Sequence, residues 1–130
     1  MNEKTIKNWI SLSDYDIKTA KAMLDSGRYL YVTFTCQQAV EKILKAIFVQ
    51  NEGKTPPYIH NLTTLSSLLF SEDELTKDQE EFIAVLNAFY LKTRYSEQIL
   101  TLSQDIDRLK AETIFQKTNE LLSWLKSRLK

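Results

Sequence analysis

The stretch RYLYVTFTCQQAVEKILKAIFVQ, Arg28–Gln50, decides the fold of this chain. Its apolar residues recur with the helical period of about 3.6 residues and cover most of the circumference of one helix. A helix that is apolar on nearly every side belongs at the centre of a fold, in contact with several neighbours. The same stretch carries a compact polar set: Gln37, Gln38, Glu41, Lys42 and Lys45. This set is either the polar part of a buried helix or a binding site.

Size and composition favour one helical domain. The chain has 130 residues, two glycines, two prolines, and 17 cationic against 17 anionic side chains. We therefore predict a single domain, residues 1–130, with no net charge to attract nucleic acid or an anionic membrane. The lone cysteine, Cys36, excludes an internal disulfide and lies on an apolar stripe, which predicts a small core residue. The chain shows neither a membrane-length apolar run nor a signal-peptide pattern, so we expect a cytoplasmic protein without membrane contacts.

Apolar spacing along the rest of the chain predicts four long helices and a short one. Gly27 and Gly53 end the first two helices, and Asn61 caps the short one. Either Ser71 with Glu74 or Thr76 with Gln79 starts the next helix through a capping box. The predicted helices are residues 4–26, 28–50 and 62–70, a fourth ending near residue 93, and 104–128, after an irregular segment Arg94–Gln104. The last helix turns Ile106, Leu109, Ile114, Leu121, Trp124 and Leu125 inward.

These elements predict an all-α fold: an up-down four-helix bundle with a short additional helix, about five helices in all. The helix 28–50 has an apolar second face that includes Tyr31, Phe34 and Val49. A second apolar face meets another helix, a ligand or a partner chain. We therefore expect a homodimer.

Residues with catalytic chemistry are few. Two glycines exclude a glycine-rich phosphate loop and one histidine excludes a histidine metal pair, so we expect no cofactor and no metal. His60 precedes a helix, where it either ties backbone groups together or acts as an acid or base. Lys92, Arg94 and Tyr95 close the fourth helix. They either favour the helix dipole or contact phosphate and a base.

Three segments, in this order, resemble the HEPN domain (higher eukaryotes and prokaryotes nucleotide-binding domain). They are LSDYDIKTAKAMLDSGRYLYVTFTCQQAVEKILKAIFV, Leu12–Val49; PPYIHNL, Pro56–Leu62; and YLKTRYSE, Tyr90–Glu97. The resemblance covers about residues 8–125. It implies a helical bundle, usually dimeric, whose relatives commonly accompany a minimal nucleotidyltransferase. Some relatives are toxins of toxin–antitoxin pairs, and many are metal-independent ribonucleases.

The ribonuclease motif of the family is incomplete here. In ribonucleases of the family, an arginine is followed, after four to six residues, by a histidine. Arg94 stands where that arginine is expected. This chain has Ile99, Leu100 and Thr101 at that spacing, and none of them transfers a proton as imidazole does. His60 belongs to a different family motif, Ile59–Leu62, and not to the ribonuclease motif. Two other positions depart from the family pattern. The family commonly has aspartate where this chain has Asn61, and Arg-Tyr-Pro-Asp where this chain has Arg94–Glu97.

Two interpretations of the polar set stay open. In one, Gln38, Glu41, Lys42 and Lys45 line a cleft with His60, Arg94 and Tyr95 that binds a nucleotide or RNA. In the other, the same side chains satisfy one another across a helix or dimer contact. Three functions follow. The first is a non-catalytic binding module, and the second is a divergent ribonuclease in which Arg94 stabilises charge and His60 or Tyr95 moves a proton. The third is a structural partner modified at Tyr95.

Overall fold

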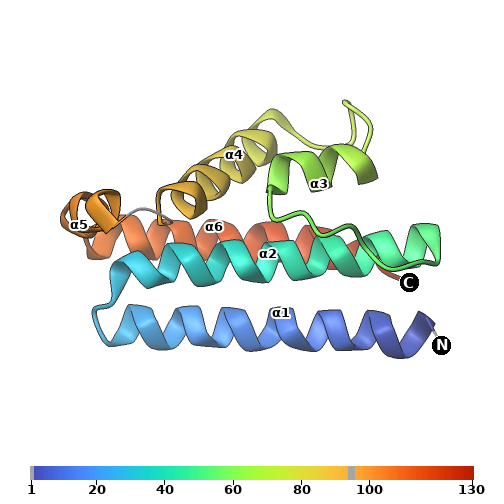
Figure 1. Ribbon diagram of the computed structural model, residues 1–130, viewed down its shortest axis with the longest axis horizontal. Coiled ribbons are helices and arrows are strands. Elements are labelled where there is room, and N and C mark those ends of the chain that lie inside the picture. Colours follow the sequence, from blue (N-terminus) through green and yellow to red (C-terminus); the bar gives the residue numbers. More distant parts are fainter. Residues whose placement is uncertain (1, 94–95) are drawn as a thin grey trace.

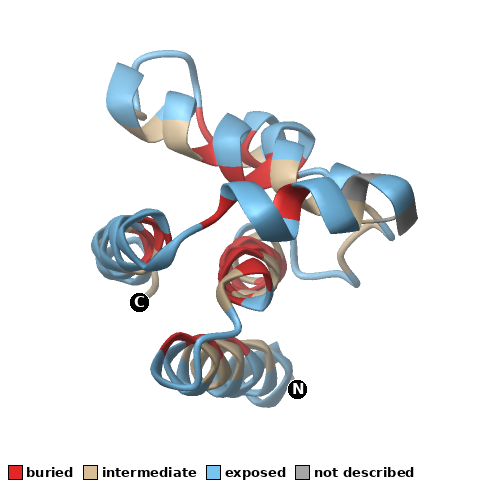
Figure 2. Cartoon of the chain, turned by 90° about the vertical axis from the view of Figure 1, so that its left-hand side faces the viewer, coloured by how far each residue is buried: buried red, intermediate tan, exposed pale blue. Residues whose placement is uncertain are grey.

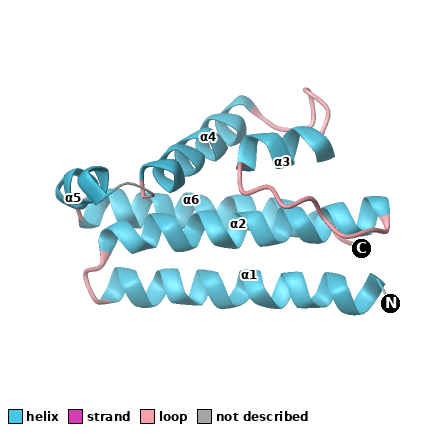
Figure 3. Cartoon of the chain, in the orientation of Figure 1, coloured by secondary structure: helices cyan, strands magenta, loops and turns pink. Residues whose placement is uncertain are grey.

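The computed structural model describes residues 2–93 and 96–130 (Figure 1). Within these residues the chain is all-α, as predicted, with six helices and no strand (Figure 3). The helices are α1 (Asn2–Asp25), α2 (Tyr29–Glu52), α3 (Leu62–Leu69), α4 (Lys77–Lys92), α5 (Ser96–Asp105) and α6 (Arg108–Ser127). The prediction of about five helices is therefore one helix too low for the part described.

The central helix is α2, which the sequence singled out. Figure 2 shows α1 on one side of it, α6 on another, and α3 and α4 on a third. The long helices α1, α2, α4 and α6 alternate in direction, as an up-down bundle requires (Figure 1). The turn from α1 into α2 is made at Gly27, whose φ of 78° is left-handed and suits glycine.

The core is built around α2, and its largest fully buried side chains include Ile43, Leu44 and Ile47. These residues recur at helical spacing and meet Ala20 and Leu24 of α1 and Leu121, Leu122 and Leu125 of α6 in one cluster. Ser13 is also buried, and its hydroxyl donates a 2.7 Å hydrogen bond to the Ala39 carbonyl. The small residues at this point let α1 approach α2 closely.

Local signals mark the end of α2 and the starts of α3 and α4 where the sequence predicts them. Gly53 has φ 67° and donates its backbone N–H to the Val49 carbonyl, which ends α2. The Asn61 side chain accepts a hydrogen bond from the Thr64 N–H and caps α3. Of the two capping boxes proposed for α4, the one formed by Thr76 and Gln79 starts the helix.

The segment before the last helix differs from the prediction. Residues 96–104 form most of α5 rather than an irregular segment, because Leu102 and Ile106 bury against the core. The last helix starts at Arg108, where the Asp107 carboxylate accepts from the Lys110 N–H and caps it. This break shifts the helical phase, so Leu109 is exposed rather than inward.

The second face of α2 packs within the chain. Phe34 stacks on Tyr90 of α4 with ring centroids 6.0 Å apart, Val49 is buried, and Tyr31 stays exposed. The homodimer expected from this face stays a prediction. No helix in the described part of the chain has an apolar stretch long enough to cross a bilayer.

Candidate functional site

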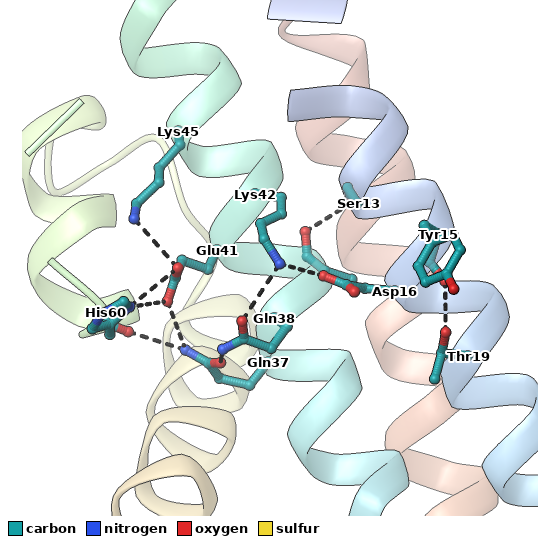
Figure 4. A network of polar contacts seen from close by, with 11 residues as sticks. Ser13, Tyr15, Asp16, Thr19, Gln37, Gln38, Glu41, Lys42, Lys45 and His60 are labelled. Atoms are coloured by element: carbon teal, nitrogen blue, oxygen red, sulfur yellow. Dashed lines mark hydrogen bonds and ion pairs between the residues drawn. The ribbon is translucent and has the colours of Figure 1, made fainter. Parts of the chain in front are cut away.

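Glu41 is the centre of a polar cluster on α2 (Figure 4). Its carboxylate lies 3.3 Å from Lys45 Nζ and 3.1 Å from His60 Nδ1. Gln37 Nε2 donates to the same carboxylate at 3.4 Å and to the His60 carbonyl at 3.0 Å. One carboxylate therefore joins α2 to the loop before α3.

The cluster continues along α2 toward α1. Gln38 Nε2 donates to Gln37 Oε1 at 2.6 Å, and Lys42 Nζ donates to Gln38 Oε1 at 3.4 Å. Lys42 also forms an ion pair with Asp16 of α1. Figure 4 shows this chain of contacts running from His60 through α2 to Asp16.

The local sequence explains how these side chains meet. Glu41 precedes Lys45 by four residues on one helix, the spacing and order that favour an ion pair. His60 is brought back to α2 by the loop that follows Gly53. In that loop the Ile59 N–H donates to the Pro57 carbonyl at 2.8 Å, which makes a tight turn directly before His60.

Aromatic rings surround the cationic end of the cluster. Lys45 Nζ lies 5.6 Å from the Trp9 ring centroid and 5.9 Å from that of Tyr58, within range of cation–π attraction. The His60 ring makes an edge contact with Tyr58 at 5.0 Å and lies 6.0 Å from Tyr90. The cluster therefore combines hydrogen-bond donors, cations and stacking surfaces.

Burial divides the cluster into two layers. Glu41 and Lys45 are 3% and 5% exposed, whereas the Lys42 and His60 side chains are 17% and 33% exposed. Among the described residues no buried side-chain nitrogen or oxygen lacks a hydrogen-bond partner. The buried pair thus has the mutual contacts expected of a structural network, and the outer layer reaches solvent.

The structure brings together five of the seven predicted ligand-binding residues: Gln38, Glu41, Lys42, Lys45 and His60. The other two, Arg94 and Tyr95, lie outside the described residues. Sequence reasoning did not place Trp9 or Asp16 in the cluster, because their contacts with Lys45 and Lys42 join helices that only the fold brings together.

Cys36 is a core residue, as its position on the apolar stripe predicts. It is fully buried, and burial raises the pKa of its thiol to about 12, more than the hydrogen bond to Thr118 lowers it. A thiol with such a pKa stays protonated near neutral pH and does not act as a nucleophile.

The residues that follow Arg94 offer no proton-transfer group at the family spacing. Ile99 packs against the core, and Leu100 is exposed. The Thr101 hydroxyl donates to the Glu97 carbonyl of its own helix at 3.3 Å. His60, the chain's one imidazole, is bonded to Glu41 instead.

Comparisons with known proteins agree with this fold. The HEPN domain family model matches residues 6–128. The crystal structure of TT1696 from Thermus thermophilus aligns with a TM-score of 0.83 and 23% identity, over 99% of this chain and 100% of that one. The crystal structure of ST0689, an archaeal HEPN homologue, aligns with a TM-score of 0.75 and 20% identity, over 96% and 98% of the two chains. No curated protein matches the chain in sequence. Because the family model spans nearly the whole length, this chain belongs to the HEPN domain family.

Proposed function

We propose that the chain is a nucleotide- or RNA-binding HEPN module that acts with a minimal nucleotidyltransferase and lacks the usual HEPN ribonuclease activity. The observation that carries the proposal is the outer layer of the polar cluster. Gln38, Lys42 and His60 are partly exposed above the buried pair of Glu41 and Lys45. Their amide, ammonium and imidazole groups suit a sugar, a phosphate and a base edge.

Charge in the described part of the cluster is balanced. Asp16 and Glu41 face Lys42 and Lys45, two carboxylates against two ammonium groups. We therefore propose that Arg94, the cation of the family motif, supplies the net attraction for a phosphate. We expect Arg94→Ala to weaken binding strongly and salt to weaken it only moderately, because few phosphate charges are neutralised.

The proposed lack of ribonuclease activity rests on proton transfer. Metal-independent cleavage of RNA needs groups that take a proton from the attacking hydroxyl and give one to the leaving oxygen. Ile99, Leu100 and Thr101 cannot do so near neutral pH. His60 Nδ1 contacts both Glu41 oxygens, at 3.1 and 3.3 Å, and His60 belongs to a family motif other than the ribonuclease motif.

One experiment tests binding and cleavage together. A fluorescent single-stranded RNA, with and without ATP as competitor, is incubated with the protein in EDTA and followed by anisotropy and by gel. We expect binding without cleavage, lost at least tenfold in Arg94→Ala. Arg108→Ala is the matched control, because Arg108 is exposed on α6 and pairs with Glu112. Failure of the wild type to bind RNA or ATP overturns the proposal.

A second candidate is a divergent metal-independent ribonuclease toxin, because His60, the one imidazole of the chain, lies beside α4, the helix that precedes the family arginine in the sequence. The His60 ring lies 6.0 Å from Tyr90, which precedes Arg94 by four residues in the sequence. In this mechanism Arg94 stabilises the charge on the phosphorane and His60 moves the proton. Cleavage in EDTA that disappears in both Arg94→Ala and His60→Ala supports it. Cleavage that survives either substitution excludes the mechanism.

The proposed partners need separate tests. A minimal nucleotidyltransferase encoded beside this chain should co-elute with it after co-expression, and the absence of co-elution contradicts that part of the proposal. Intact-mass spectrometry of the same sample with ATP reports whether Tyr95 carries a nucleotide. Sedimentation velocity of the chain alone tests the proposed homodimer, which Tyr31→Glu should weaken, because Tyr31 is the exposed residue of the second face of α2.

A further inference from the structure

A groove separates α4 from α6 on the side of the molecule away from α1. Its cavity volume is about 520 Å³. Phe82 of α4 and Ile114 and Leu121 of α6 supply apolar walls, and Val85 of α4 is 44% exposed at the lip. Ile114 and Leu121 are 8% and 3% exposed and form the floor of this apolar seam, whereas solvent reaches Val85 and part of Phe82.

The two walls of this groove are held together at one end. Phe70, before α4, packs on Trp124 of α6 with ring centroids 5.4 Å apart. Beside them Arg128 forms an ion pair of 2.9 Å with Glu74. These two contacts join the segment between α3 and α4 to the end of α6, beside one end of the groove.

The rim of the groove is acidic. The groove is lined by three carboxylates and one cation: Asp78 and Glu81 on α4, Glu120 on α6, and Lys117. Within the described part of the chain none of these four side chains forms an ion pair. An apolar floor between unpaired carboxylates attracts an apolar surface flanked by positive charge.

We propose that the α4–α6 groove binds one basic amphipathic helix of a partner protein. Ile114 and Leu121 are seven residues apart on α6, which is about 10 Å along a helix and equals two turns of an incoming one. Apolar residues of the partner at i, i+3 or i+4 and i+7 enter the seam. Its lysines or arginines meet Glu81 and Glu120. This inference does not depend on nucleotide binding at the polar cluster.

The test uses two synthetic probes. The first is an amphipathic peptide of about four turns, with leucines on one face and lysines on the flanks. The second has glutamate in place of every lysine. Anisotropy should show binding of the lysine peptide and at least tenfold weaker binding of the glutamate peptide. Equal binding of the two peptides, or no binding of the lysine peptide, overturns the proposal.

Variants then assign the site. Glu81→Lys with Glu120→Lys should weaken the lysine peptide about tenfold, because both flanking charges are reversed. Glu52→Lys with Asp73→Lys reverses two exposed charges outside the groove and should leave binding unchanged. Equal loss in the two double variants means non-specific attraction and overturns the site.

A third variant tests the apolar seam and the competing occupant. Val85→Glu places a charge at the lip and should also weaken the lysine peptide at least tenfold while the melting temperature stays near that of wild type. Unchanged peptide binding in this variant refutes the seam. Sedimentation velocity of the wild type and of Val85→Glu tests the competing occupant. If the wild type self-associates and Val85→Glu abolishes that association, the groove binds a second copy of the chain, and the partner-helix proposal is overturned.

Discussion

The ion pair of Glu41 and Lys45 gives the sharpest test of what the polar cluster does. Its charged atoms are 3.3 Å apart, and the two residues are 3% and 5% exposed. Glu41→Gln removes the negative charge and keeps the shape of the side chain and one acceptor oxygen. It leaves the Lys45 ammonium buried, with the rings of Trp9 and Tyr58 as its remaining attractive neighbours.

The structure sets the size of the effect. Removal of one partner from a buried ion pair costs about 3–5 kcal/mol. Two contacts reduce that cost: the cation–π attraction of Lys45, worth about 0.5–2 kcal/mol, and the hydrogen bond that the new amide oxygen still accepts, worth about 1 kcal/mol. We therefore expect Glu41→Gln to lower the free energy of unfolding by about 2 kcal/mol, the middle of the range that these terms allow.

Urea unfolding followed by circular dichroism measures this change, as a lower midpoint with the same slope. Glu112→Gln is the matched control. Glu112 also pairs with a cation four residues away, Arg108, but is 45% exposed. Because solvent screens that pair, the control should unfold at the wild-type midpoint.

A double-mutant cycle separates the pair from its surroundings. Lys45→Met removes the cation and keeps an apolar stem of similar length. The double variant should lose less free energy of unfolding than the two single variants lose together. The difference, the coupling energy between Glu41 and Lys45, should be about 1–2 kcal/mol. Equal midpoints for Glu41→Gln and Glu112→Gln, or a coupling energy of zero, would refute the reasoning that the buried pair stabilises the fold.

Three further predictions concern other parts of the chain. Burial raises the pKa of the Cys36 thiol to about 12, so iodoacetamide near neutral pH should label Cys36 only as fast as the protein unfolds; labelling at the rate of a free thiol contradicts this. Hydrogen bonds from the Ser71 backbone N–H and the Ser71 hydroxyl lower the pKa of Glu74 from its ordinary value. Glu74 therefore stabilises the fold above its unfolded pKa and loses that effect as pH falls through its folded pKa, so thermal melts of Glu74→Gln should depend less on pH in this acid range than those of wild type. Leu102→Ala should cost about 2–4 kcal/mol in urea unfolding, and Leu100→Ala, at an exposed position of the same helix, should cost almost nothing; equal effects contradict the observed packing of α5.

The sequence predicts α1 to α4 well because the turns that separate them carry local signals. Gly27 and Gly53 take left-handed φ values, and Asn61 and Thr76 accept hydrogen bonds from the first turns of α3 and α4. The boundary between α5 and α6 carries only Asp107, without glycine or proline. The burial that stabilises α5 comes from tertiary packing, which apolar spacing over ten residues does not determine.

The polar cluster also combines contacts that local sequence predicts with contacts that only the fold determines. The ion pair of Glu41 with Lys45 is local, four residues apart, and the helical period predicts it. The contacts of Glu41 with His60 and of Lys42 with Asp16 span 19 and 26 residues. The path of a loop and the packing of α1 on α2 decide these contacts. The family resemblance identifies His60 as a motif residue, but the hydrogen bonds of its ring depend on the path of the loop between α2 and α3.

The two layers of the cluster determine how ligand binding should be tested. Loss of binding in a Lys45 variant is ambiguous, because that side chain is 5% exposed and its loss also disturbs folding. Gln38 and Lys42 lie in the outer layer, where a substitution leaves the pair of Glu41 and Lys45 in place. Gln38→Ala should therefore lower affinity strongly. It should lower the urea midpoint less than Glu41→Gln does, because it removes only the hydrogen bond to the buried Gln37 Oε1. Glu41→Gln should move the midpoint whether or not a ligand is present. If the two variants instead lose the same stability, the outer layer is also part of the folding network, and the ligand must be sought at Arg94 and Tyr95.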